Sequence, residues 1–396
     1  AWDTSNVKDM GGLFSNAKVF NSIVSLWNTS RVTIMKSMFE NAHAFDGDLE
    51  SWDVSRVTNF GGMFAGASSF NDEGLSGWNV SSGLTMDRMF AGATSFNSDI
   101  SAWDVSHVTD MEKMFLDATV FNSDISAWQV SSVINMERTF NSAKKFNSDL
   151  SAWDTSSVTN MKGMFFSATS FNRTLSSWDM SSVTTIRAMF DEAVAYNDDL
   201  SAWNTSRINN MRGAFSGASS FNSNIANWDV SNVTNMEKMF FQALVFNGSV
   251  SSWDVSTVIT MESMFHNAKS FNQDLCEWGD KFPYSSADDI FSGSGCTFQD
   301  VPQLDEMGPF CASSCSATLG SPSSPSTSSV SNPTRSPSSS LSPPASPTSP
   351  NVTTEDVASP PSKSAPTPAT SSAIHLVPSS LILFFGFCLL NNLFHQ

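Results

Sequence analysis

Four cysteines are the residues best suited to covalent or metal chemistry. Cys276, Cys296, Cys311 and Cys315 lie close together in the sequence, whereas Cys388 lies in an apolar terminal segment. An even cluster of cysteines is typical of disulfides formed in an oxidising compartment. Zinc is the rival interpretation, but no histidine falls within the cluster, and only Cys311 and Cys315 are closely spaced. The sequence therefore predicts that these four cysteines form disulfides.

Aspartates recur at two fixed positions of a repeated sequence unit, and carboxylate oxygens are ligands that calcium prefers. The first position follows a tryptophan and the second precedes an aliphatic residue; the members are Asp3, Asp53, Asp104, Asp154, Asp179, Asp229 and Asp254, and then Asp48, Asp99, Asp124, Asp149, Asp199 and Asp274. Calcium needs about six to eight converging oxygens, and Asn28, Asn79, Gln129 and Asn204 interrupt the first row. Capping of turn amides is the simpler role, so we predict no metal site.

An asparagine follows the second phenylalanine of nearly every unit. The members of this row are Asn21, Asn71, Asn97, Asn122, Asn147, Asn172, Asn197, Asn222, Asn247 and Asn272. They could face a ligand, but stacked repeats also offer identical partners to such amides. We therefore expect a buried asparagine ladder that satisfies backbone groups of the turns between neighbouring units.

No set of residues resembles an active site. The methionines recur beside phenylalanines at helical spacing, which indicates core packing rather than copper binding. The five histidines occupy unrelated positions of the repeat, so neither a catalytic triad nor a metal cluster is visible. We expect no enzyme, no catalytic residues and no cofactor.

Asn-x-Ser/Thr sequences mark candidate sites of N-glycosylation in a secreted chain. They occur at Asn28, Asn79, Asn172, Asn204, Asn232, Asn247 and Asn351. Several coincide with the asparagine-rich turns of the repeat itself, so many of these matches are expected to be fortuitous. The exposed ones are expected to carry glycans.

These residues are positioned by a regular tandem repeat. All 12 tryptophans lie before residue 280, and their spacing is constant except between Trp52 and Trp78, where one extra residue sits near Asp72. The spacing is about 25 residues, and a fixed period of this length is the signature of a solenoid or array. One unit cannot bury enough apolar surface alone, so neighbouring units must stack.

Within one unit, Met111, Met114, Phe115 and Ala118 recur at the spacing of one helix face, which predicts a helix of two to three turns. Residues 124–130 suit a short strand or an extended turn. The fold class predicted is an α/β repeat: a right-handed, gently curved, LRR-like solenoid of about eleven 25-residue units, followed by a disordered stalk.

One unit departs from the pattern. Gly83 stands where Val is usual. We expect a local irregularity near Trp78, next to the one-residue insertion.

Composition divides the chain into four parts. Residues 1–278 form the LRR-like array, residues 279–315 a cysteine-containing cap, residues 316–372 a stalk dominated by Ser, Pro and Thr, and residues 373–396 a hydrophobic anchor signal. The stalk cannot bury enough apolar surface to fold and resembles an extended, O-glycosylated spacer.

The terminal segment predicts membrane attachment. Small residues, a short spacer and a final apolar run match a GPI-anchor signal, with Ser371 as the first attachment candidate and Ser364 as the second. The alternative is a single spanning helix, but the uninterrupted apolar run is short and no basic residue follows it. Because the sequence begins at Ala1 within a repeat, we expect a fragment or a processed chain.

The charge balance limits the classes of binding partner that we expect. The chain carries 38 Asp and Glu against 20 Lys and Arg, a formal net charge of −18 at pH 7. Acidic surfaces disfavour nucleic acid and anionic lipid. They are compatible with cations, basic proteins and neutral glycans.

The best-formed units resemble a known repeat. Residues 228–240 read WDVSNVTNMEKMF, followed by Ala243 and Phe246-Asn247. This unit resembles the repeat of BspA-like leucine-rich-repeat surface proteins, in particular the mycoplasma-type, lipoprotein-associated branch. The resemblance covers roughly residues 1–278. It implies an LRR-like solenoid on a cell surface with adhesion or ligand binding as its usual role, and it brings no catalytic residue set.

We therefore expect a non-catalytic cell-surface protein that binds an extracellular protein or glycan and no nucleic acid. A C-terminal lipid anchor, or a single spanning helix, would attach it to the membrane. The alternative is a structural cell-wall or extracellular-matrix protein in which cations bridge the acidic rows.

Overall fold

The computed structural model describes residues 2–305 and 308–315. The description below concerns the first of the two units into which the chain divides, Ala1–Pro322, within these residues. The predictions for the stalk (316–372) and for the anchor segment (373–396), with attachment at Ser371, lie outside the described residues, as does the sequon at Asn351.

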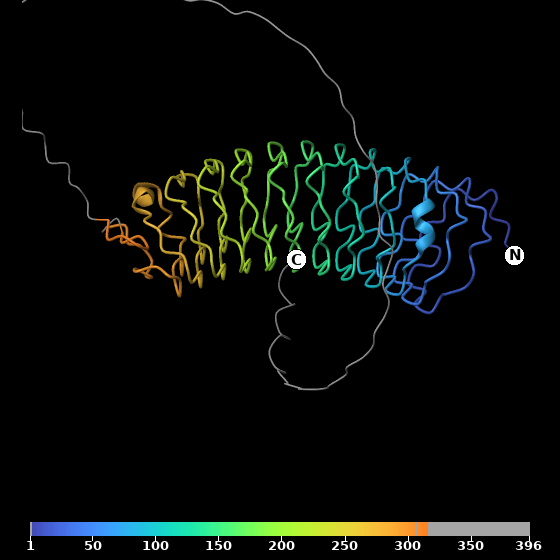
Figure 1. Cartoon of the computed structure of the whole chain (residues 1–396), viewed down its shortest axis with the longest axis horizontal. Coiled ribbons are helices and arrows are strands. Elements are labelled where there is room, and N and C mark those ends of the chain that lie inside the picture. Colours follow the sequence, from blue (N-terminus) through green and yellow to red (C-terminus); the bar gives the residue numbers. More distant parts are fainter. Residues whose placement is uncertain (1, 306–307, 316–396) are drawn as a thin grey trace, which may run out of the picture. The chain divides into compact units, whose positions relative to one another are not determined.

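The repeats form successive coils joined by parallel pairing between equivalent residues (Figure 1). One residue of each coil pairs with its equivalent in the next coil; these bridge residues are Asp9, Ile34, Asn59, Thr85, Asp110, Asn135, Asn160, Thr185, Asn210, Asn235 and Thr260. Such pairing satisfies backbone groups between coils, as stacked repeats require. The handedness and the curvature expected from the sequence stay predictions.

Regular secondary structure is sparse in the described part of the chain. It has two 3-10 helices, η1 (Glu73–Gly77) and η2 (Cys276–Lys281), and its strand pairings are isolated bridges. The helices predicted for each Met-Phe segment are therefore absent as α-helices among the described residues, although the residues assigned to their buried face are all buried.

Left-handed residues explain why these segments are not helical. Lys113 and Asp117 have φ of 56° and 55°, and equivalent residues of other coils share this conformation. Met111, Lys113 and Phe115 donate their N–H groups to the next coil, whereas Met114 donates to Met111 in a turn. Along each such segment, tight turns that need a positive φ at their third residue alternate with backbone hydrogen bonds to the next coil. The buried residues thus have the spacing of a helix face, although the backbone forms successive tight turns and no α-helix.

Of the short strand or extended turn predicted at residues 124–130, the structure shows a turn. Asp124 accepts a hydrogen bond from the Ser126 N–H at 2.9 Å, and the Trp128 N–H donates to the Ile125 carbonyl at 3.2 Å. Backbone pairing falls instead at Asp110. A short polar side chain that bonds its own backbone two residues on favours a turn over a strand.

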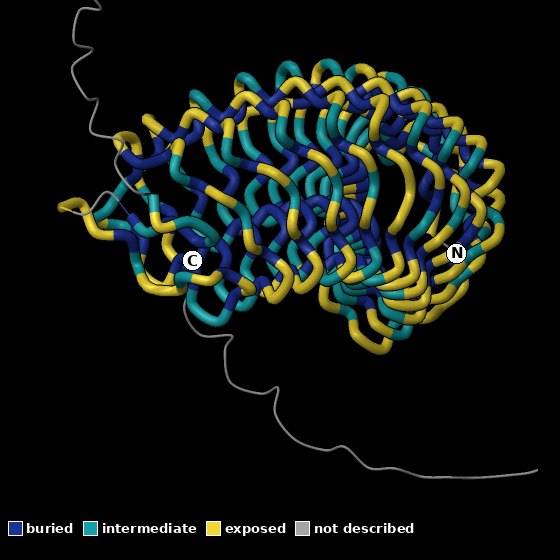
Figure 2. Tube along the Cα trace, turned by 60° about the vertical axis from the view of Figure 1, so that its left-hand side comes forward, coloured by how far each residue is buried: buried dark blue, intermediate teal, exposed yellow. Residues whose placement is uncertain are grey.

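The predicted spine of Trp, Met and Phe is confirmed as the core. Figure 2 shows buried segments alternating with exposed ones along every coil. The Trp103 and Trp128 rings stack at 6.4 Å between centroids, and Phe115 stacks on Phe140 at 5.7 Å. The Trp128 indole N–H donates to the Ile100 carbonyl at 3.0 Å. Each stacked pair contributes about 0.5–1.5 kcal/mol beyond area burial, and each coil repeats these pairs.

The insertion between Trp52 and Trp78 is accommodated in η1, where the Asp72 side chain accepts the Gly74 N–H. The departure at Gly83 has a different cause. A Cβ at Gly83 would lie 3.4 Å from Phe60 Cε2 and 3.1 Å from Met86 Cε. The Val80 carbonyl oxygen is nearest to such a Cβ, at 3.0 Å, and the Phe60 ring, which replaces a methionine, adds to the groups around this position.

The cysteine-containing segment begins as a further rung of the array. Met261 and Phe265 donate their N–H groups to Ser286 and Ile290, and Phe291 stacks on Phe265 at 6.0 Å. The pairing between coils thus continues beyond residue 278, the predicted end of the array.

Candidate functional site

The two aspartate rows cap turns. In the first row, Asp104 accepts the Ser106 N–H at 3.0 Å, and in the second row Asp149 accepts the Ser151 N–H at 2.9 Å. Hydrogen bonds from these serines lower the pKa of both aspartates. The carboxylates are exposed and each serves its own coil. This is the turn-capping role that the sequence analysis favoured over calcium.

The asparagine row is a continuous ladder, but it is not buried. The Asn122 N–H donates to Asn97 Oδ1 at 2.6 Å, and the Asn147 N–H donates to Asn122 Oδ1 at 2.7 Å. Asn97 and Asn122 are nevertheless exposed. The predicted hydrogen-bonded ladder between coils is therefore confirmed, whereas the prediction that it is buried was wrong. Sequence period identifies stacking partners, but it does not show which side of the backbone faces solvent.

The sequons fall into separate structural groups. Asn28, Asn79 and Asn204 replace aspartates of the first row, and their Oδ1 atoms accept the N–H and hydroxyl of the serine two residues on. Asn172 and Asn247 belong to the asparagine ladder, and the Asn232 amide donates to the Ser206 carbonyl at 2.8 Å. All six are exposed.

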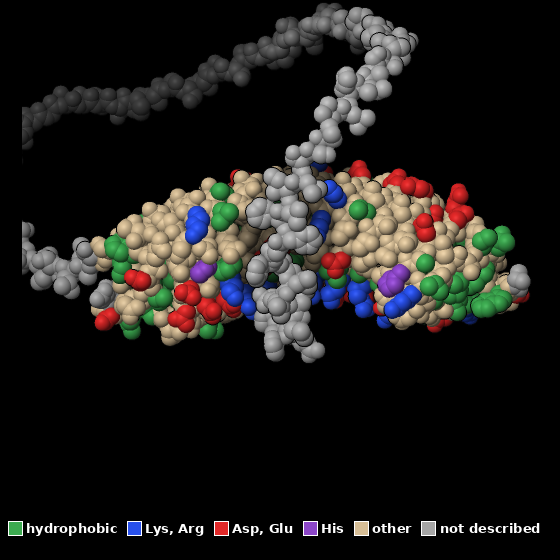
Figure 3. All heavy atoms as spheres, turned by 90° about the horizontal axis from the view of Figure 1, so that it is seen from below, with side chains coloured by type: hydrophobic (Ala, Val, Ile, Leu, Met, Phe, Trp, Pro, Cys, Tyr) green, Lys and Arg blue, Asp and Glu red, His purple; other side chains and the backbone are tan. Residues whose placement is uncertain are grey.

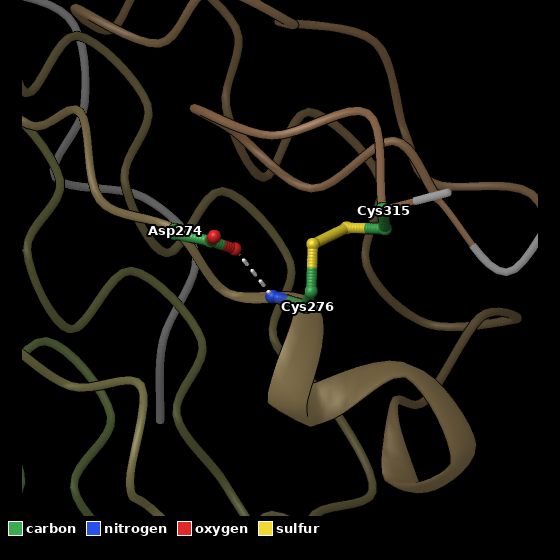
Figure 4. Close-up of side chains that lie close together, drawn as sticks. All are labelled: Asp274, Cys276 and Cys315. Carbon is green, nitrogen blue, oxygen red and sulfur yellow. Dashed lines mark hydrogen bonds between the residues drawn. A yellow bond between two sulfur atoms is a disulfide. The ribbon is translucent and has the colours of Figure 1, made fainter. Parts of the chain in front are cut away.

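The four clustered cysteines form two disulfides in the structure, Cys276–Cys315 and Cys296–Cys311. Asp274 lies beside the first disulfide, and its carboxylate accepts the Cys276 N–H at 3.0 Å (Figure 4). Asp274, Cys276 and Cys315 are close enough to surround a cation. Both sulfurs are committed to the disulfide, however, so this trio supplies a single carboxylate ligand.

A charged row runs along the coils at the position two residues after each bridge residue. We call these residues the charged row; its members include Lys36, Asp87, Glu112, Glu137, Lys162, Arg187, Arg212, Glu237 and Glu262. The next position, the turn row, holds the left-handed residues Ser37, Gly62, Arg88, Lys113, Arg138, Gly163, Ala188, Gly213, Lys238 and Ser263. Figure 3 shows Lys and Arg side chains along the middle of one face of the molecule.

Sequence reasoning missed the charged row, although its signal was present. Lys162, Arg187 and Arg212 occupy the same position of three successive units. Aligning the units by their tryptophans would have placed these three cations in one column. Net charge had directed attention to the acidic rows instead.

Asp191 is the most perturbed carboxyl of the array. Burial raises its pKa to about 7, partly opposed by a hydrogen bond from Ser216 and reinforced by the nearby Glu192. Tyr196 is fully buried where other coils carry phenylalanine. Within the described residues its hydroxyl has no hydrogen-bond partner.

No helix within residues 2–305 and 308–315 is long and apolar enough to cross a bilayer. The membrane attachment predicted for residues 373–396 lies outside this range and stays a prediction.

Stacked 25-residue coils with a common aromatic core define a tandem-repeat protein. The chain belongs to the family described as "Mycoplasma protein of unknown function, DUF285", whose model matches residues 1–98, 63–148, 124–208 and 195–303. The overlapping matches follow the repeats. No curated protein matches the chain.

Proposed function

We propose that this chain is a non-catalytic, BspA-like surface protein whose LRR-like solenoid binds an extracellular protein or glycan, for adhesion or ligand capture. The observation that supports the proposal is that each coil combines constant buried positions with variable exposed positions. From Val32 onward the Trp, Met and Phe positions of the repeat are buried and nearly invariant between coils, whereas the charged and turn rows are partly exposed and vary. A rigid scaffold with variable surface positions is how solenoids build binding surfaces.

An extracellular location is part of this proposal. Disulfides persist in oxidising compartments, and two of them join the final segment of the described chain. The exposed sequons on the aspartate row suit a glycosylated surface protein. The predicted stalk and anchor signal would hold the array away from the membrane.

Binding is tested by screening the purified, fluorescently labelled chain against arrays of glycans and extracellular proteins. We expect saturable binding to one ligand class, competed by the unlabelled chain. Failure to bind any array component, together with failure to adhere to cells or to matrix, would contradict a binding role.

The anchor is tested on intact cells that express the full-length protein. A GPI anchor predicts release into the medium by phosphoinositide-specific phospholipase C and loss of attachment in a Ser371→Leu, Ser364→Leu variant. A tail that stays attached after lipase treatment and is cleaved by protease added from the cytoplasmic side would favour the spanning helix.

A structural role as a cation-bridged wall or matrix protein is the second candidate. Asp99, Asp124 and Asp149 occupy one position of successive coils, and the charge of Asp124 raises the pKa of the other two, against the lowering by their serine hydrogen bonds. A divalent cation shared between molecules would relieve this repulsion. Extraction of the protein from walls by a chelator, but not by lipase, would favour this role over ligand binding.

A further inference from the structure

Cations are concentrated on one part of this acidic chain. Eight of its 20 Lys and Arg residues occupy the charged and turn rows; they are Lys36, Arg88, Lys113, Arg138, Lys162, Arg187, Arg212 and Lys238. Three successive coils carry a cation at the charged row itself, namely Lys162, Arg187 and Arg212. Neighbouring coils are paired here, because the Gly163 N–H donates to the Arg187 carbonyl and the Ala188 N–H to the Arg212 carbonyl, each at 2.8 Å.

The middle cation differs from its neighbours in having no acidic partner. Lys162 forms a salt bridge with Glu137 at 2.8 Å, and Arg212 forms one with Glu237 at 2.9 Å. The half-buried Arg187 has neither a salt bridge nor a side-chain hydrogen bond to any residue that the structure describes. An arginine held in this way keeps its five donors available.

The surroundings of Arg187 compensate its charge only in part. Burial, followed by the charges of Arg212 and Arg138, lowers the pKa of Arg187, while the charges of Glu237 and Glu137 only partly oppose this effect. Arginine stays protonated at neutral pH even so. A partly compensated cation among other cations favours the binding of an anion.

The turn row beside these three cations carries only small residues. Gly163, Ala188 and Gly213 stand where flanking coils carry Arg138 or Lys238. A Cβ at Gly163 would already lie 3.2 Å from Arg138 Cγ. The small size of these residues adds no bulk beside the three cations, of which Lys162 and Arg212 have side chains that are 31% and 29% exposed.

We propose that Lys162, Arg187 and Arg212 bind successive anionic groups of an acidic polysaccharide, either a sulfated or a uronate-containing chain. This inference rests on the proposed binding function and names its ligand class. Coils paired as parallel strands repeat at about 4.8 Å, which is comparable to one sugar residue of an extended chain. Guanidinium groups match the paired oxygens of carboxylate and sulfate.

Two observations favour a polysaccharide over a nucleic acid. The column of three cations ends at Glu137 and Glu237 on either side, and the remaining chain is strongly acidic, whereas duplex DNA needs an extended basic surface. The half-buried Phe166 follows Gly163 in a tight turn. An aromatic ring in the same turn as Gly163 can pack on the apolar face of a sugar ring.

The test measures binding of the full chain to heparin, polygalacturonate and neutral dextran, with duplex DNA and phosphatidylserine vesicles as further arms. Arg187→Gln should weaken binding to an acidic polysaccharide about tenfold, as expected for the loss of one charge-assisted pair. Arg88→Gln is the matched control, because it removes the same charge from the turn row at a residue already paired with Asp87 at 3.0 Å. Arg187→Lys should retain part of the affinity, and thermal unfolding should show that all variants fold.

The outcomes separate the two proposals. Equal weakening by Arg187→Gln and Arg88→Gln, or equal affinity for DNA, vesicles and acidic polysaccharide, would overturn the assigned site in favour of general anion attraction. Binding only to dextran or to a protein would overturn the acidic ligand and leave the proposed binding function intact. If Arg187→Gln fails to fold, Ala188→Gln, which adds bulk beside the row without adding charge, must lower the affinity instead.

Discussion

A single residue that differs from the residues at the equivalent position of other coils shows which substitutions the repeat accepts. Tyr196 occupies a phenylalanine column between Phe171 and Phe221, with ring centroids 5.8 and 6.4 Å away. Its ring fits the stack, but its hydroxyl is buried without a partner among the described residues. A buried hydroxyl that lacks a hydrogen bond keeps its full desolvation penalty.

Tyr196→Phe should therefore stabilise the array by about 1 kcal/mol. The reverse change one coil away, Phe171→Tyr, should destabilise it by a similar or larger amount. Urea unfolding of both variants beside the parent chain gives the two free energies. A destabilised Tyr196→Phe variant would mean that the hydroxyl has a partner in solution.

Asp191 predicts a pH dependence of stability. Its pKa is raised to about 7 in the folded chain, above the value of about 3.9 expected when unfolded. The protonated carboxyl is therefore favoured by folding. Its contribution is fully present below about pH 4 and is lost as pH rises through about 7.

Asp191→Asn should remove this dependence. The variant should match the parent at pH 4 and exceed its stability at pH 8 by roughly 2–4 kcal/mol, the linkage equivalent of the raised pKa. Chemical unfolding at several pH values measures the difference. Parallel curves for parent and variant from pH 4 to 8 would show that Asp191 ionises freely in the fold.

At the scale of the coil, the sequence identified the buried residues but not their conformation. Spacings of three and four residues fit a helix, yet the same spacing arises from tight turns in which Lys113 and Asp117 are left-handed. Glycine at the equivalent Gly163 and Gly213 was the available signal, because glycine readily adopts positive φ. Lysine, arginine and serine at other copies concealed it.

The pair Phe60 and Gly83 shows compensation between coils. Gly83→Val should destabilise the array by about 1–3 kcal/mol, because its methyl groups must fit beside the Phe60 ring, which a Cβ alone already approaches to 3.4 Å. Phe60→Met alone should also destabilise it, by leaving a cavity. The double variant should recover much of the loss, since the pair then matches the other coils.

A double-mutant cycle by urea unfolding tests this coupling. Residues in contact give interaction energies of about 0.5–3 kcal/mol. Additive effects would show that Gly83 is required for the turn at Val80 rather than for the Phe60 ring.

The disulfide-linked end should be a separable element. Its bonds close segments separated by 39 and 15 residues, and each such bond stabilises by roughly 3–4 kcal/mol in the chain-entropy account. Reduction should therefore increase amide exchange over residues 293–315 and leave the coils before Trp253 protected. Exchange measured by mass spectrometry distinguishes this from global unfolding, which would show one cooperative unit.

For the whole molecule, the sequence predicted the stacking and misjudged the charge. Period and aromatic columns were sufficient to predict the stacked coils, because each coil repeats the same contacts. Net charge averages over the chain, so −18 gave no indication of the column of Lys162, Arg187 and Arg212. Which residues form a surface depends on the register between coils, and the bridge residues define that register.

That register makes the array modular, and deletion of one coil is its most demanding test. Removing residues 111–135 joins Asp110 to Met136, so every core position keeps its residue type. The shortened chain should fold, with a urea m-value lower by about a tenth, because m scales with the surface exposed on unfolding.

Removing residues 111–136 instead joins Asp110 to Glu137 and places a carboxylate in a buried methionine position. That variant should be strongly destabilised or unfolded, since an unpaired buried charge is costly. Near-UV circular dichroism of the tryptophans measures the unfolding of both variants. Equal stability of the two deletions would show that stacking does not depend on the 25-residue register.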